Sequence, residues 1–315
     1  MNTLSRSSEP AGLERAVSSP PDSYYGRPIV KPHVWTPYIP WYFWIGGTTG
    51  AACVHGFVAR LRGEDEVADV QRWVAFAGIV TSPVLLILDL GVRRRFLNML
   101  RVFKPTSPMS VGSWVLTALG GAVTGSLIAD EILGVPPLAR ACDAVAALLG
   151  PVLTTYTAVL VSNTATPVWH EAHAELPLVF ASSGIAGAGA CAAAFAPAAQ
   201  RRSARRMMIG GAIAMGVTAR EMETRLGRLG EPYSQGKAGA FKRASSALAL
   251  TGVAVALLGR KSTAANRVAA ALVAAAGICE RFAVLDAGKQ SAEDPKYVVH
   301  QQRETLAEGG RTPLR

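Results

Sequence analysis

The sequence has little charge and few cysteines for its length. Charged residues make up 17% of its 315 positions, whereas soluble domains average about a quarter. Its four cysteines stand apart in apolar segments without a CxxC pair, so we interpret them as packing residues rather than metal ligands or disulfide partners. Residues 1–36 contain neither a twin arginine nor the apolar core of a signal peptide, and we therefore expect no cleaved signal.

Long apolar stretches dominate what is present, and the mean hydropathy is +0.25. Crossing a membrane takes about 20 mostly apolar residues. Eight stretches meet or approach that length: 37–59, 70–90, 108–130, 137–162, 175–197, 206–224, 240–259 and 265–285. The sequence therefore predicts an all-α integral membrane protein with eight transmembrane helices. We expect a polar N-terminal arm (1–36), a transmembrane domain (37–286) that begins with a four-helix bundle (37–163), and a polar C-terminal tail (287–315).

The excess of basic residues indicates a membrane surface rather than a nucleic acid. The net charge is +10, but the cations lie between apolar runs and form no continuous face. Eight crossings would place both termini on one side, where 21 of the 32 Lys and Arg residues fall. The excess of positive charge on cytoplasmic loops then predicts a plasma-membrane protein with cytoplasmic termini.

A basic segment separates the second and third stretches. It contains Arg93, Arg94, Arg95, Arg101 and Lys104. Phe96, Leu100 and Phe103 follow at i, i+4 and i+7, which predicts a short amphipathic helix in the membrane interface. Ser107 before Pro108 predicts an N-cap for the next helix. By charge alone, this segment is a loop held against anionic lipid.

Pairs of small residues four positions apart predict close helix packing, because lipid supplies no hydrophobic force between spanning helices. These pairs are Gly46 and Gly50, Gly121 and Gly125, and Ala186 and Ala190.

Four segments carry motifs in the order found in a known family of membrane proteins. They read YYGRPIVKPHVWTPYIPWYFWIGGTTGAA (24–52), DLGVRRRF (89–96), SPMSVGSW (107–114) and YTAVLVSNTATPVWHEAHAELPLVFASS (156–183). Over about the first 190 residues the chain thus resembles the NrfD/PsrC family, the quinone-reactive membrane subunits of polysulfide-reductase-type complexes. It departs from the family pattern at Val92 and Arg93, which replace Arg-Pro.

The resemblance implies a membrane subunit of an oxidoreductase complex, with no haem or metal of its own. Such a subunit anchors an iron–sulfur (ferredoxin-like) subunit, commonly beside a molybdopterin catalytic subunit, and exchanges electrons with it. An exchangeable quinone or quinol, such as menaquinone, would bind in the first bundle (37–163). The basic loop 91–104 would form the rim of that site and a docking surface.

The resemblance and the depth of the residues in the predicted spans single out candidate site residues. The catalytic candidates are Tyr156 and Asp89, and the quinone-binding candidates are Tyr38, Trp41, Arg95, Tyr156, His170 and Glu171; no metal site is expected. Tyr156 lies about 10 Å inside its span at 1.5 Å per residue. Its hydroxyl either donates to a quinone carbonyl or packs against a neighbouring helix. Asp89 either accepts a proton at the rim or forms a salt bridge with Arg95 that fixes the loop.

The other candidates keep two interpretations each. Tyr38 and Trp41 stand where some family members carry quinone-contacting polar residues, but they also fit an aromatic belt at the interface. His170, Glu171 and His173 could relay protons or be ordinary loop residues, and the HEAH spacing differs from that of the HExxH zinc motif.

In the far half of the membrane, His55 and Asp143 would support a proton route if they face one bundle. His55 has no partner histidine for haem.

Two other functions remain open. The chain could be a membrane anchor without quinone chemistry, or a small transporter. Transporters often show internal repeats and helices broken at mid-membrane. No repeat is visible here, and the charged residues cluster at the ends of the predicted spans.

Overall fold

The computed structural model describes residues 29–31 and 33–299, so most of the predicted arm and part of the predicted tail lie outside the described residues. Within them the chain is helical and contains no strand, which confirms the all-α prediction. The elements in chain order are α1 (Tyr38–Leu61), α2 (Asp65–Asp89), η1 (Arg93–Leu100), α3 (Pro108–Leu127), η2 (Ile128–Ile132), α4 (Pro136–Ser162), α5 (Pro167–Glu171), α6 (Leu176–Phe195), α7 (Arg201–Leu226), η3 (Gly227–Ser234), α8 (Gly236–Leu258) and α9 (Thr263–Glu293).

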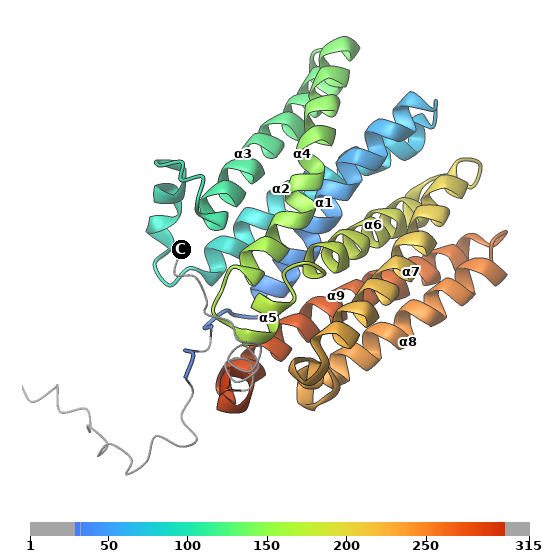
Figure 1. The fold of residues 1–315 in the computed structure, drawn as a ribbon. Helices are drawn as coiled ribbons and strands as arrows, with labels where there is room; N and C mark the ends of the chain where they lie inside the picture. Colours follow the sequence, from blue (N-terminus) through green and yellow to red (C-terminus); the bar gives the residue numbers. More distant parts are fainter. Residues whose placement is uncertain (1–28, 32, 300–315) are drawn as a thin grey trace, which may run out of the picture.

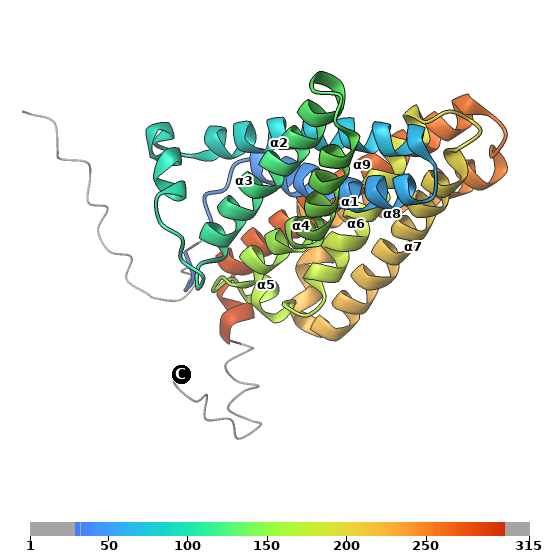
Figure 2. The same cartoon turned by 90° about the horizontal axis from the view of Figure 1, so that it is seen from above.

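The long helices form two bundles side by side (Figure 1). Helices α1 to α4 make the first bundle, and α6 to α9 make the second. Helices α1 and α6 join the bundles, since α6 packs against α1 and α4 as well as against α7 and α9. The chain before α1, the η1 segment and the end of α9 lie at the same end of the helices in both views (Figure 2). We call this end the terminal face and the opposite end the far face.

By length and apolar composition, six helices in the described part of the chain are able to cross a membrane: α2, α3 with η2, α4, α6, α8 and α9. The sequence predicted eight crossings. The other two long helices, α1 and α7, have 24 and 26 residues and are long enough but more polar. Helix α1 is rich in glycine, threonine and aromatic residues, and α7 carries arginines in its first turns and charged residues in its last.

Glycines bring α1 and α4 into backbone contact. A methyl group on Gly50 would overlap the carbonyl oxygen of Gly150, and one on Gly150 would overlap that of Gly50. Gly50 is the second member of the small-residue pair that the sequence predicted as a packing site. These glycines therefore let α1 and α4 pack tightly against each other in the first bundle.

Three local predictions can be compared with the structure. Ser107 caps α3, and its hydroxyl accepts a hydrogen bond from the backbone of Ser110, as predicted. The basic loop contains a 3₁₀ helix, η1, rather than an amphipathic α-helix that reaches Phe103. Helix α9 continues to Glu293, so residues 287–293, which the sequence placed in a polar tail, are helical. Small residues on this last part of α9, among them Gly288 and Ser291, are buried against the protein, and this packing sustains the helix.

Candidate functional site

A cavity of about 330 Å³ lies in the first bundle at the terminal face. It is lined by Trp35, Ile39, Tyr42, Phe43, Leu86, Asp89, Leu90, Arg95, Met99, Met109, Ser113, Tyr156 and Leu160. These residues come from α1, α2, η1, α3 and α4 and from the segment before α1. Three of the residues that the sequence singled out, Asp89, Arg95 and Tyr156, therefore meet at one cavity.

Tyr156 forms one wall of the cavity and packs on a glycine. It is only 9% exposed, and its ring lies so close to Gly112 of α3 that a methyl group there would overlap it. Gly112 is the glycine of the SPMSVGSW motif. The hydroxyl of Tyr156 makes no hydrogen bond within the described residues. A buried phenol with an unused hydroxyl is available to donate to a bound molecule.

Asp89 is held by the chain that precedes α1. Its Oδ1 accepts a hydrogen bond from the backbone nitrogen of Thr36 at 2.9 Å and another from the Thr36 hydroxyl at 2.6 Å. No ion pair joins Asp89 to Arg95 among the described residues, although both line the cavity. The predicted salt bridge is therefore wrong, because Thr36 already orients the carboxylate and Arg95 lies on η1 at the cavity edge.

Tyr42 is a site residue that the sequence analysis missed. It is 1% exposed, and its buried hydroxyl has no hydrogen-bond partner in the described part of the chain. Tyr38 and Trp41 are 43% and 41% exposed and do not line the cavity. The spacing of Tyr42 from Gly46 and Gly50 could have identified it, because these residues share one face of a helix.

Aromatic stacking holds the segment before α1 over the terminal face. The ring of Trp35 stacks on that of Trp169 of α5, with centroids 5.4 Å apart and an angle of 18°. His33 lies against both indole rings. The Trp169 indole nitrogen donates to the carbonyl oxygen of Val284 at 2.8 Å, and Lys289 Nζ donates to that of Trp35 at 2.8 Å. The cavity wall at Trp35 is thus fastened to α9 of the second bundle.

His170 and Glu171 do not line the cavity. His170 is exposed, and Glu171 forms an ion pair with Arg225 of α7 at 3.2 Å. The same arginine binds Glu175 through two nitrogens, one of them at 2.7 Å. Of this loop, only Trp169 supports the cavity, through its stacking on Trp35. The side chains of Arg225, Glu171 and Glu175 instead tie the loop to the second bundle.

The basic loop borders the cavity on the outside. No residue of η1 is buried, while Arg95 and Met99 reach the cavity wall. The cations of the loop are Arg93, Arg94, Arg95, Arg101 and Lys104, and all are exposed. Phe103 packs edge-on against Trp114 with centroids 6.2 Å apart. The loop therefore presents a positive surface directly beside the cavity.

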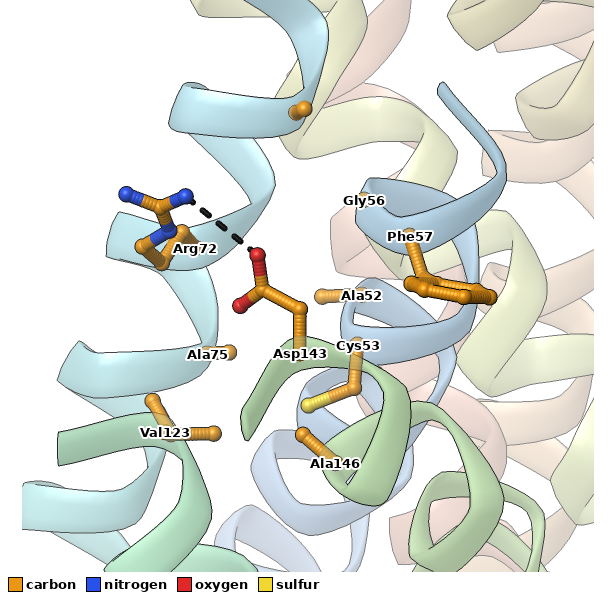
Figure 3. Close-up of a pocket in the computed structure, with 10 residues that line it drawn as sticks. Ala52, Cys53, Gly56, Phe57, Arg72, Ala75, Val123, Asp143 and Ala146 are labelled. Carbon is orange, nitrogen blue, oxygen red and sulfur yellow. Dashed lines mark hydrogen bonds and ion pairs between the residues drawn. The ribbon is translucent and has the colours of Figure 1, made fainter. Parts of the chain in front are cut away.

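A separate group of charges lies at the far face of the first bundle (Figure 3). Arg72 of α2 is 8% exposed and forms ion pairs with Asp130 of η2 and with Asp143 of α4, the latter at 3.3 Å. The Ser126 hydroxyl donates to Asp143 Oδ1 at 2.5 Å. Figure 3 shows Arg72 and Asp143 pointing toward one another beside Cys53. Charged side chains are therefore buried between the helices of the first bundle as well as gathered at the helix ends.

His55 does not join that group. The amide nitrogen of Gln71 lies 2.6 Å from His55 Nδ1 and donates to the carbonyl oxygen of Ala188 at 3.0 Å. Asp143 is bound by Arg72 and Ser126 instead, so His55 and Asp143 have different partners.

The terminal-face cavity combines apolar walls with a few polar groups. Ile39, Phe43, Leu86, Met109 and Leu160 supply apolar surface. Tyr42, Asp89, Arg95, Ser113 and Tyr156 are the lining residues with polar side-chain groups. Mostly apolar walls with a few polar groups are typical of a pocket for a small molecule. No group of three or more potential metal ligands occurs within residues 29–31 and 33–299.

The sequence matches the polysulfide reductase family model, NrfD_2, over residues 22–294. The match includes every residue that lines the terminal-face cavity. It also continues through α6 to α9, beyond the segments in which motifs were apparent. No curated protein matches the sequence.

Proposed function

This chain belongs to the NrfD-type polysulfide reductase family, and on that premise we propose that it is the quinone-reactive membrane subunit of an oxidoreductase complex. The observation that carries the proposal is the cavity in the first bundle. It brings together residues of three family-like motifs: Asp89 and Arg95, Met109 and Ser113, and Tyr156. Residues from three separate motifs line one pocket, and ligand binding explains this convergence better than packing alone.

The cavity fits a quinone head group. Among the described residues, the hydroxyls of Tyr156 and Tyr42, which both line the cavity, have no hydrogen-bond partner; we propose that Tyr156 donates to one acceptor oxygen of the ring and that Tyr42 donates to the other once a small rotation of its side chain exposes the hydroxyl. Phe43, Leu86 and Leu160 would pack against the ring and the start of the isoprenoid tail. A bound quinone would supply the two-electron, two-proton redox chemistry, and the protein would supply binding, orientation and proton transfer.

Asp89 is placed to handle protons. Its Oδ1 is occupied by two hydrogen bonds from Thr36, which fix the carboxyl group and leave Oδ2 free for a proton. We propose that Asp89 accepts a proton released in the cavity and passes it to water at the terminal face. His170 and Glu171 lie outside the cavity, and we assign them no contact with the head group.

The exposed cations of the basic loop would bind the partner subunit. Electron transfer requires the partner's iron–sulfur cluster to lie close to the quinone, and the loop borders the cavity on its outer side. We propose that Arg93, Arg94 and Arg101 contact an acidic surface of an iron–sulfur subunit, with a molybdopterin catalytic subunit beyond it. Charge complementarity of this kind steers and orients docking.

We propose that all eight long helices cross the membrane. Helices α1 and α7 would extend about 36 and 39 Å at 1.5 Å per residue, more than the hydrocarbon core of about 30 Å. Both lie alongside helices that are apolar enough to cross: α2 and α4 beside α1, and α6 beside α7. Eight crossings would put both termini on the side of the terminal face, and the excess of Lys and Arg there favours the cytoplasmic side.

The experiment is quinol binding and oxidation by the complex purified with its partner subunits. We expect quinol to reduce the partner's iron–sulfur clusters, and the substitutions Tyr156→Phe and Asp89→Asn to slow that reduction at least tenfold. Thr155→Val is the matched control, because it also removes one hydroxyl from α4. That hydroxyl is bound to the Pro151 carbonyl oxygen at 2.8 Å, away from the cavity.

A quinone-binding measurement on the isolated chain separates this proposal from a plain membrane anchor. Fluorescence of Trp35, which lines the cavity, should be quenched by a bound quinone. Absence of saturable quinone binding by the correctly folded chain would refute the assignment, as would unchanged cluster reduction in the Tyr156→Phe, Asp89→Asn double variant.

A further inference from the structure

The second bundle contains a polar cavity that the quinone chemistry does not use. It has a volume of about 440 Å³ and lies between α7, α8 and α9. The residues that line it are Met215, Gly216, Ala219, Arg220, Glu223, Thr224, Lys242, Ser245, Ser246, Ala249 and Glu280. Charged residues inside a transmembrane bundle are costly and are a sign of function.

Glu280 is the deepest acid of this cavity. It is 5% exposed, and it lies within the apolar stretch of α9 that is able to cross the membrane. Ser245 of α8, which is 2% exposed, lies beside it and faces the same cavity. Among the described residues Glu280 forms no ion pair, whereas Glu223 of α7 is paired with Lys242 of α8. Glu280 is therefore the acidic group of the cavity without a salt-bridge partner among the described residues.

The charged groups around Glu280 come from every neighbouring element. Helix α7 supplies Arg220 and Glu223, and α8 supplies Lys242. The 3₁₀ helix η3 supplies Tyr233, whose hydroxyl is buried without a partner. The thiol of Cys279 lies next to Glu280 in α9.

Arg281, the residue after Glu280 in α9, carries a buried positive charge on the side of α9 toward the first bundle. It is 0% exposed, and its Nη2 donates to the carbonyl oxygen of Phe180 at 2.9 Å. The guanidinium lies over the Phe180 ring at 3.7 Å, and its Nε and Nη1 have no hydrogen-bond partner within residues 29–31 and 33–299. The Phe180 ring in turn packs against Phe43, a wall of the terminal-face cavity, with centroids 5.8 Å apart. A buried cation in this position needs a counter-charge, and Glu280 is the adjacent acid.

The cavity is reached from the terminal face. Arg220 and Glu223 lie in the last two turns of α7, and Lys242 lies in the second turn of α8, about 9 Å from its start at 1.5 Å per residue. Both helix ends are at the terminal face. Ionised side chains at this depth retain water around them. Water on that side thus has a polar route between α7 and α8 that ends at Glu280.

We propose that Glu280 is a proton-binding site that exchanges protons with water at the terminal face through this cavity. The carboxyl group takes up one proton and becomes neutral, or releases it and becomes the counter-charge of Arg281. Arg220 and Lys242 line the polar entrance of the cavity, and Ser245 orients the carboxyl group of Glu280. The site is a property of the second bundle and does not depend on quinone binding.

Dicyclohexylcarbodiimide, which reacts with protonated carboxyl groups in apolar surroundings, tests the proposal on the purified full-length chain in lipid nanodiscs. We expect a mass-spectrometric adduct on Glu280 whose yield falls as the pH rises through a single titration. Glu280→Gln should abolish the adduct. Glu221→Gln, which changes an exposed acid of α7, is the matched control and should leave the adduct on Glu280 unchanged.

A second variant separates proton binding from a structural role. Lys242→Gln removes a cation that favours the carboxylate, so the midpoint of the labelling curve should move to higher pH by at least half a unit. Lys261→Gln removes an exposed cation at the far face and should not move it. Absence of an adduct on Glu280 at every pH, or identical curves for Lys242→Gln and the unaltered chain, would overturn the proposal.

Discussion

Gly112 of α3 lies directly against the phenol ring of Tyr156 of α4, with no room for a methyl group between them. The contact explains why a glycine stands in the SPMSVGSW motif. It lets the ring lie flat against α3 and form one wall of the terminal-face cavity. The motif therefore shapes a side chain on a neighbouring helix in addition to starting its own helix.

Replacing that glycine should damage the cavity. In Gly112→Ala, the new methyl group would push the Tyr156 ring into the cavity, and we expect the dissociation constant for quinone to rise about tenfold, equivalent to about 1.4 kcal/mol. Gly121→Ala on the same helix is the control, because no atom lies within 4 Å of its added methyl group. Quinone titration of both variants by tryptophan fluorescence measures the difference. Equal affinity in the two variants would contradict the packing argument.

The orientation of α1, in which Tyr42 rather than Tyr38 lines the cavity, gives a second prediction. Tyr42→Phe removes a buried hydroxyl without a protein partner. If that hydroxyl binds the quinone, affinity should fall by about 0.5–1.5 kcal/mol, roughly two- to twelvefold. Tyr38→Phe changes an exposed side chain outside the cavity and should alter affinity less than twofold. A larger loss of affinity in Tyr38→Phe than in Tyr42→Phe would instead favour Tyr38, the residue that the sequence predicted, as the quinone contact.

The charges at the far face should contribute to stability as a unit. Arg72→Gln leaves Asp143, whose side chain is 17% exposed, without its cation. Breaking a buried ion pair in this way costs about 3–5 kcal/mol. The double variant Arg72→Gln, Asp143→Asn should recover most of that loss, because no unpaired charge remains between these two positions. Thermal unfolding in detergent measures both, and a double variant less stable than the single one would contradict the pairing.

The loop between α5 and α6 gives a prediction of pH dependence. The hydrogen bond from Arg225, together with its charge, holds the pKa of Glu175 below its ordinary value of 4.5. Because the folded-state pKa is lowered, the contribution to stability is complete above about pH 4.5 and is lost as the pH falls through the folded-state pKa.

The size of this effect is limited by exposure. Arg225 is 39% exposed, so solvent screening limits the contribution to about 1 kcal/mol. Arg225→Gln should therefore lower the melting temperature at pH 7 and reduce the difference between pH 7 and pH 4. A pH dependence as steep in the variant as in the unaltered chain would show that Glu175 is not responsible.

Sequence and structure agree most closely where a pattern reports a local property. Apolar length located each long helix, and Ser107 before Pro108 located the start of α3. The depth of Tyr156 and the position of Asp89 at the end of α2 placed both residues at the same end of the bundle, where they line one cavity. These features depend on neighbouring residues in the chain, and a single sequence records them.

The features that the sequence did not reveal depend on contacts between distant segments. Thr36 rather than Arg95 binds Asp89, because the segment before α1 folds back over α2. The inward face of α1 carries Tyr42 rather than Tyr38, since the helix is rotated to put its glycines against α4. Glu280 and Arg281 were overlooked because neighbouring residues of one helix face different partners there, α8 for Glu280 and α6 for Arg281.

The fastening of Trp35 by Lys289 and by Trp169 has a consequence for how the protein can be divided. A polypeptide ending at Asn163 would retain every residue that lines the terminal-face cavity. It would lose both anchors of the indole that closes the cavity at that face. The second half of the chain thus supports the first, and neither gene fragments nor separately expressed halves should form an intact terminal-face cavity until they are recombined.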